Sequence, residues 1–176
     1  IIKKIPEYIS NPDAIIRTNN DRLNLFAQIS TAKGNNGILS IELNTVKDIN
    51  NHYDSFKDDD NFFEMTAFDH SGVVGHLIMR FTDEEKKVLR FGFVIVDDSK
   101  RGKGYGKEML SLALKYSFEI LKVEKVTLGV FENNLPAYYC YKSVGFKDVI
   151  MQHSEYYNVL NECWKCLELE ILINNI

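Results

Sequence analysis

A short segment that combines glycine with positive charge is the part of this sequence best suited to bind an anion. It reads KRGKGYGKEM over residues 100–109, with glycine at positions 102, 104 and 106. Glycine has no Cβ, so an anion can approach the backbone closely. The segment also precedes an apolar run with helical spacing, and the first turn of a helix offers unpaired N–H groups and partial positive charge. We therefore predict a phosphate-binding turn, with a solvated basic loop as the alternative.

Two common nucleotide-binding motifs do not fit this segment. The Walker motif Gly-x-x-x-x-Gly-Lys-Ser/Thr is absent, and the dinucleotide motif is spaced Gly-x-Gly-x-x-Gly rather than the Gly-x-Gly-x-Gly found here. Dinucleotide-binding folds also begin with a parallel βαβ unit, whereas the run before this segment is predicted to end an antiparallel meander. Binding of ATP or NAD is therefore kept only as a disfavoured alternative.

The elements around the segment follow from the spacing of the apolar residues. Alternation predicts strands over 62–68, 73–81 and 88–96, and their short polar links indicate an antiparallel meander. The elements expected after the glycine segment are a helix over 107–121, a strand over 125–131, a helix over 136–145, and closing strands over 146–152 and 163–173. Before the meander we expect one or two helices within 1–37, a strand over 38–44 and a helix over 45–56.

Two motifs in this order resemble a known family. The stretch Arg101-Gly102-Lys103-Gly104-Tyr105-Gly106 matches the pattern Arg/Gln-x-x-Gly-x-Gly/Ala, which is the diphosphate loop of the GNAT superfamily of acetyl-CoA-dependent N-acetyltransferases. The stretch Asn134-x-x-Ala137-x-x-x-Tyr141-x-x-x-Gly145-Phe146 matches the second motif of the superfamily, on the helix after the next strand. Both motifs fall on the expected elements, and the resemblance covers roughly residues 38–173.

The resemblance implies a fold and a domain organisation. The expected fold is α/β (α+β), with a mixed twisted sheet, an antiparallel meander that leads into a parallel crossover, and helices on both faces. Residues 38–176 would form the acetyltransferase domain. Residues 1–37 would be a helical N-terminal extension of the same domain.

The resemblance also implies how the acetyl-CoA co-substrate is held. The strand before the loop splays from the next parallel strand, and its backbone at Val94, Ile95 and Val96 pairs with the pantetheine arm. Asn134 bonds the same arm, unless it serves only as a helix cap, and Ala137 lets the cofactor pass close to the helix. The residues implied to form the diphosphate loop, with three basic side chains that offset its charge, are Arg101, Gly102, Lys103, Gly104, Tyr105, Gly106 and Lys107.

The implied reaction is attack of an amine on the thioester in a ternary complex. Tyr141 lies near the thioester sulfur in this scheme, and its phenol, with an ordinary pKa of about 10, can donate a proton to the leaving thiolate. A backbone N–H near Val94 or Ile95 stabilises the oxyanion. No carboxylate occurs in VLRFGFVIV, so Glu64, His76 and a water-mediated route stay open as the general base.

Composition limits the function classes further. The chain has 176 residues, a formal net charge of −4 and 3 cysteines. The charge argues against nucleic-acid binding, and no apolar run is long enough to predict a membrane span. The odd cysteine count suits a cytoplasmic protein without a disulfide framework, and no metal-ligand spacing is present, so no metal is expected. The acceptor, a small-molecule or protein amine, stays open. The oligomeric state, monomer or homodimer, stays open as well. The alternative from another functional class is a sensor protein that binds acyl-CoA without turnover.

Overall fold

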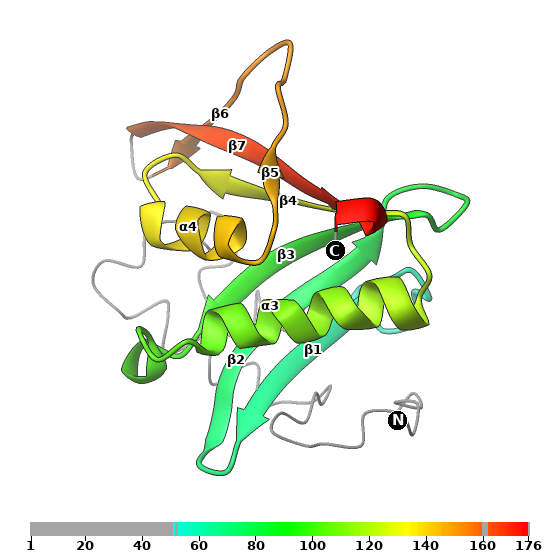
Figure 1. Cartoon of the computed structure of the whole chain (residues 1–176), viewed down its shortest axis with the longest axis vertical. Coiled ribbons are helices and arrows are strands. Elements are labelled where there is room, and N and C mark those ends of the chain that lie inside the picture. Colours follow the sequence, from blue (N-terminus) through cyan, green and yellow to red (C-terminus); the bar gives the residue numbers. More distant parts are fainter. Residues whose placement is uncertain (1–50, 52, 160–161, 176) are drawn as a thin grey trace.

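The computed structural model describes residues 51, 53–159 and 162–175 (Figure 1). The described strands form one seven-stranded mixed sheet in the order β1-β2-β3-β4-β7-β5, with β6 beside β7. The elements expected within 1–37 and 38–44, and the proposed division at residue 37, lie outside the described residues. The α/β (α+β) prediction with a meander and a parallel crossover is confirmed.

The meander consists of β1 (Phe62–Asp69), β2 (Gly72–Phe81) and β3 (Val88–Val96), which pair antiparallel in that order. An aspartate organises each of its turns. Asp69 accepts hydrogen bonds from Ser71 N at 2.8 Å and Oγ at 2.7 Å. Asp83 accepts from the backbone N–H groups of Lys87 and Val88 at 3.0 and 2.8 Å. These carboxylates hold the short links predicted from the sequence.

The crossover leaves β3 through a 3₁₀ turn (Asp98–Lys100) and α3 (Tyr105–Lys115), which ends in a π-helical turn (Tyr116–Ile120). The chain then returns as β4 (Lys125–Phe131), parallel to β3. Next comes α4 (Leu135–Ser143), which is followed by Gly145 at φ 105°. In Figure 1 both helices lie in front of the sheet, with α3 across β2 and β3. The crossover therefore brings the glycine segment to one end of the sheet.

The main core fills the space between the sheet and these two helices. Fully buried members include Leu77, Met79, Leu89, Leu110 and Leu128. Each such side chain contributes roughly 1.5–3 kcal/mol through burial. This layer fixes α3 on the sheet.

The other face of the sheet carries a buried polar network. His76 alternates with Leu77 along β2 and so points away from α3. Its Nε2 lies 2.8 Å from Tyr53 Oη, and its Nδ1 lies 3.2 Å from Thr66 Oγ1. Tyr53 belongs to a short helical stretch at the start of the described chain. This stretch places helical structure on the second face, as the predicted architecture requires.

The C-terminal strands differ from the prediction. The strand expected over 146–152 is wrong beyond β5 (Lys147–Asp148), because most of the apolar run after it is not buried: Ile150 is 98% and Met151 45% exposed. Strand β6 (Glu155–Val159), which pairs with β7 (Glu162–Leu172), was not predicted. A 3₁₀ turn (Ile173–Asn175) follows β7. Within the described residues, no helix is both long enough and apolar enough to cross a membrane.

Candidate active site

The parallel strands β3 and β4 separate soon after they meet. Their ladder joins Val88–Arg90 to Lys125–Thr127, although β3 continues to Val96 and β4 to Phe131. Over its whole length β4 stays paired with β7 on its other side. The splay implied by the family resemblance is therefore present in the structure, and it opens toward the glycine segment.

An ion pair closes the narrow end of this splay. The Arg90 guanidinium on β3 forms a two-pronged contact with the Glu168 carboxylate on β7, with Nη2 and Oε2 at 3.1 Å. It also donates to Thr127 Oγ1 on β4 at 3.4 Å. The hydrogen bonds that Arg90 donates to Glu168 raise the pKa of Arg90. A Cβ at Gly129 would lie 3.0 Å from Arg90 Nη2, so the glycine leaves the guanidinium room to cross β4.

A β-bulge distorts β3 opposite His76. The register of β2 and β3 shifts between His76 and Ile78, and Phe93 adopts φ 46°, a left-handed value that is strained for a bulky residue. Such strain amounts to roughly 1–3 kcal/mol and is held by the surrounding structure. The predicted oxyanion donor, near Val94 or Ile95, falls directly after this bulge. Bulges re-aim backbone groups, so the geometry suits that role.

The bulge also sets where the three predicted pantetheine-binding residues point. Val94 and Val96 pack against the core beneath α3, whereas Ile95 is buried outside that cluster and pairs with His76. Their side chains are therefore packing residues, and any contact with the cofactor would use their backbone.

The glycine segment presents a run of backbone donors. Among the described residues, the N–H groups from Gly102 to Lys107 have no hydrogen-bond partner, and the first helical bond of α3 comes from Glu108 N to Gly104 O at 3.1 Å. Gly104 is the N-cap of α3. Such an array at a helix start is suited to an anion.

The glycines serve different purposes within this array. Gly102 and Gly104 have φ values of 75° and 90°, and a Cβ on either would meet no atom within 4 Å. The backbone conformation, rather than crowding, requires glycine there. A Cβ at Gly106 would lie 3.3 Å from Cys140 Sγ on α4. Gly106 therefore permits the close approach of α3 and α4.

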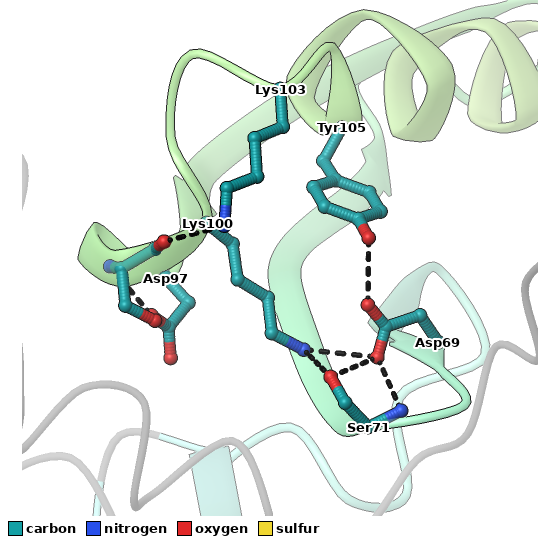
Figure 2. A network of polar contacts seen from close by, with 7 residues as sticks. Asp69, Ser71, Asp97, Lys100, Lys103 and Tyr105 are labelled. Carbon is teal, nitrogen blue, oxygen red and sulfur yellow. Dashed lines mark hydrogen bonds and ion pairs between the residues drawn. The ribbon is translucent and has the colours of Figure 1, made fainter.

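Three of the four basic side chains of the segment already have partners within the chain. Lys100 Nζ contacts Asp69 Oδ1 at 3.0 Å, and Arg101 Nη1 contacts Asp98 Oδ1 at 2.9 Å (Figure 2 shows the first). Lys103 Nζ donates to Ser99 O at 3.1 Å. In the part of the chain that the structure describes, Lys107 forms no ion pair and remains exposed. Among the described residues, Lys103 and Lys107 are not paired with a carboxylate. Of the residues predicted to offset the diphosphate charge, these two could therefore do so without breaking an ion pair.

Tyr105 lies in the predicted cofactor loop, but its side chain points elsewhere. Its hydroxyl donates to Asp69 Oδ2 at 2.8 Å (Figure 2). Only its backbone N–H belongs to the donor array described above. Sequence reasoning missed Asp69 because nothing near residue 69 indicates a contact with residues 100 and 105.

The second motif forms the start and the buried face of α4. Asn134 Oδ1 accepts from Ala137 N at 3.4 Å, which is the helix-cap role left open by the sequence. Tyr141 is only 6% exposed and packs edge-on against Phe146. Its hydroxyl makes no hydrogen bond to any residue that the structure describes. Burial raises the pKa of Tyr141, so this phenol stays protonated at neutral pH.

The two residues considered as general base differ in environment. His76 is fully buried, and both ring nitrogens have partners, which is typical of a structural histidine. Glu64 is partly buried on β1 and stays a prediction. In the described residues no group of His, Cys, Asp or Glu is arranged to hold a metal ion.

Comparison with known proteins decides the family. A model of the acetyltransferase (GNAT) family matches residues 35–146, which is more than half of the chain. The chain belongs to this family. The GNAT match spans the meander, the splayed strands, the glycine segment and α4, and it ends at Phe146, shortly after that helix.

Individual relatives share shorter stretches. This GNAT chain is 36% identical over 52 residues to the spermine/spermidine N(1)-acetyltransferase of Bacillus subtilis (strain 168), which is 30% of this chain and 34% of that protein. It is 32% identical over 68 residues to an N-acetyltransferase 9-like protein of Caenorhabditis briggsae, which is 38% of this chain and 34% of that protein. The chain thus matches about a third of the length of these curated relatives.

Solved structures agree over a greater length. The crystal structure of spermidine N-acetyltransferase from Vibrio cholerae, in complex with CoA and spermine, aligns with a TM-score of 0.78 at 19% identity. The alignment covers 94% of this chain and 98% of that chain. At this identity the likeness establishes the GNAT fold.

The ion pair at the narrow end of the splay yields a stability prediction. Glu168→Gln leaves the half-buried Arg90 without its counter-charge, so we expect the free energy of unfolding to fall by about 1–2 kcal/mol. The matched control is Glu170→Gln on the same strand and face, because the Lys125–Glu170 pair is longer, at 3.6 Å, and more exposed. That variant should change stability by less than about 0.5 kcal/mol. Urea unfolding measures both, and equal effects would contradict the special role of the Arg90 pair.

Proposed function

We propose that this chain transfers an acetyl group from acetyl-CoA to a primary amine, by direct attack in a ternary complex. The observation that carries the proposal is the run of unpaired N–H groups from Gly102 to Lys107, located where β3 and β4 have separated. Membership of the GNAT family supports it. So does the related fold from Vibrio cholerae, whose crystal structure holds CoA and spermine.

The coenzyme fits this end of the sheet by charge and shape. The donors from Gly102 to Lys107 would hold the diphosphate, with Arg101, Lys103 and Lys107 to offset its charge. The pantetheine arm would lie in the splay, along the backbone of Val94–Val96. Asn134 and Ala137, at the start of α4, would border the arm on the β4 side. These assignments rest on the placement of the two motifs on the splayed strands.

The reaction follows from the groups near the splay. The amine nitrogen attacks the thioester carbonyl carbon, a C–N bond forms, and the carbonyl oxygen becomes an oxyanion that a backbone N–H after the bulge can stabilise. Collapse of this intermediate breaks the C–S bond. The Tyr141 hydroxyl then donates its proton to the departing sulfur. The amine proton leaves through Glu64 or through water.

We infer a small polyamine as the acceptor. The names of the relatives point to this class, because the Bacillus subtilis relative is a spermine/spermidine N(1)-acetyltransferase and the Vibrio cholerae structure contains spermine. A formal net charge of −4 favours a cationic acceptor. A protein amine is the competing acceptor. An acyl-CoA sensor without turnover is favoured by one observation, the absence of a carboxylate from β3.

The deciding experiment measures thiol release from acetyl-CoA with separate acceptors. Spermidine, spermine, an aminoglycoside and a peptide with a free N-terminus form the panel, and calorimetry with CoA runs in parallel. We expect release that depends on spermidine or spermine. Release with the peptide alone would replace the polyamine by a protein acceptor. Saturable CoA binding without release would favour the sensor, and preferential heat protection by ATP or NAD would contradict coenzyme A binding altogether.

Removal of one hydroxyl tests the proton donor. Tyr141→Phe keeps the ring against Phe146, so kcat should fall about 100-fold while the affinity for CoA changes little. Tyr139→Phe, an exposed tyrosine on the same helix, is the matched control and should behave as the unmodified chain. Since burial raises the pKa of Tyr141, its ionisation should not reduce kcat below pH of about 10. An unchanged kcat in Tyr141→Phe with a good acceptor would contradict the role.

A change of one glycine tests the loop. Gly104→Ala adds a side chain to a residue with φ 90°, where it meets no neighbour but strains the backbone. The loop should relax away from its donor geometry, so CoA affinity should fall about tenfold. Calorimetry measures this, and thermal unfolding of the unliganded variant reports any loss of fold. Unchanged CoA affinity would count against the assignment of the diphosphate to this loop.

A further inference from the structure

One carboxylate from the meander binds the glycine segment on both sides of Gly102 and Gly104. Asp69, at the end of β1, accepts a hydrogen bond from Lys100 Nζ at 3.0 Å and from Tyr105 Oη at 2.8 Å (Figure 2). Lys100 is the first residue of the segment, and Tyr105, in its middle, is the first residue of α3. These contacts join residues 31 and 36 positions apart in the sequence.

The contact is well shielded and strongly polarised. The side chains of Lys100 and Asp69 are 15% and 10% exposed. Ser71 adds hydrogen bonds to the same carboxylate, and Lys100 Nζ also donates to Ser71 Oγ at 2.8 Å. Hydrogen bonds from Ser71, Lys100 and Tyr105 hold the pKa of Asp69 well below its usual range. The carboxylate is therefore ionised and fixed at neutral pH.

The segment between the two contacts needs such a restraint. Gly102 and Gly104 both adopt positive φ, and glycine loses more conformational freedom than any other residue when it is fixed. The N–H groups can converge on one anion only while these glycines keep their φ values. An attachment on each side of them limits the conformations that the segment can reach.

Because Asp69 is negatively charged, an effect of its charge on anion binding can be distinguished from an effect on the shape of the loop. A negative charge beside an anion-binding loop weakens the binding of the anion by repulsion. It also neutralises Lys100, which could otherwise attract the anion. If charge alone mattered, removal of this carboxylate would tighten binding of a diphosphate. If the carboxylate shapes the loop, its removal would weaken binding.

Resting on the proposed function of this loop, we propose that Asp69 is a positioning residue. Through Lys100 and Tyr105 it sets the conformation of the diphosphate loop before the coenzyme binds. The role belongs to the β1–β2 turn, which has no place in either sequence motif.

The test compares Asp69→Asn with the unmodified chain. We expect the dissociation constant for CoA, measured by calorimetry, to rise about tenfold, with a matching rise in KM for acetyl-CoA and an unchanged kcat. Acetyl-pantetheine, a thioester without the diphosphate, should react with unchanged kcat/KM. A variant that is merely misfolded or less stable would lose activity with both thioesters.

Two further variants sharpen the comparison. Asp98→Asn removes an exposed carboxylate that pairs with Arg101 in the same region but does not bridge the segment, so CoA should bind equally well or more tightly. Tyr105→Phe retains every charge and removes one hydrogen bond to Asp69, so a loss of several-fold in CoA affinity is expected. This milder variant keeps the test decisive if Asp69→Asn does not fold.

The outcomes separate this proposal from the proposed function. An unmodified chain that binds no CoA overturns both. An unmodified chain that binds CoA, together with equal or tighter binding by Asp69→Asn and Tyr105→Phe, overturns only the positioning role. Weaker binding by both variants, with unchanged use of acetyl-pantetheine, supports it.

Discussion

The separation of β3 from β4 is the constraint on which the rest of this structure depends. Backbone N–H and C=O groups need partners, so two strands that part must each be held by something else. β4 is held throughout by β7, and β3 is held by β2 on its other side. The Arg90–Glu168 pair, with Thr127, fixes the last position at which the two strands still meet. A sheet built in this way can open on one side without losing its order.

The direction of the splay explains why both motifs lie at one end of the sheet. Because β3 and β4 are parallel, their carboxyl ends lie at the same edge, and each is followed by a helix. The N-termini of α3 and α4 therefore both start beside the open end, as Figure 1 shows. Gly106 then allows the two helices to approach, since its missing Cβ would lie 3.3 Å from Cys140 Sγ. Topology and one small residue together bring the glycine segment close to α4.

Local sequence patterns predicted the elements but not the contacts between them. The alternating runs of the meander, the glycine segment and the proline-initiated α4 each depend on residues that are neighbours in the chain, and these were predictable. The contact of Asp69 with Lys100 and Tyr105, and that of Arg90 with Glu168, join distant segments and leave no local pattern. The bulge at Phe93 is invisible for a similar reason, because a bulky residue at φ 46° is imposed by packing against local preference. The error at 146–152 has another origin: an apolar run predicts burial, yet Ile150 is exposed.

Two buried polar side chains show how structural and functional roles can be told apart. His76 and Tyr141 are both buried, and both project from regular elements. The two nitrogens of His76 are bonded to Tyr53 and Thr66, so its polarity is fully used within the fold. The Tyr141 hydroxyl has no such partner among the described residues, and a buried donor left unpaired destabilises the fold by roughly 1–3 kcal/mol. A group that forms its hydrogen bond only when a ligand is present recovers this loss on binding, so the unpaired phenol favours the very complex in which it would act. The lack of a partner, more than the burial, is therefore the observation that supports the proposed role of Tyr141 as a proton donor.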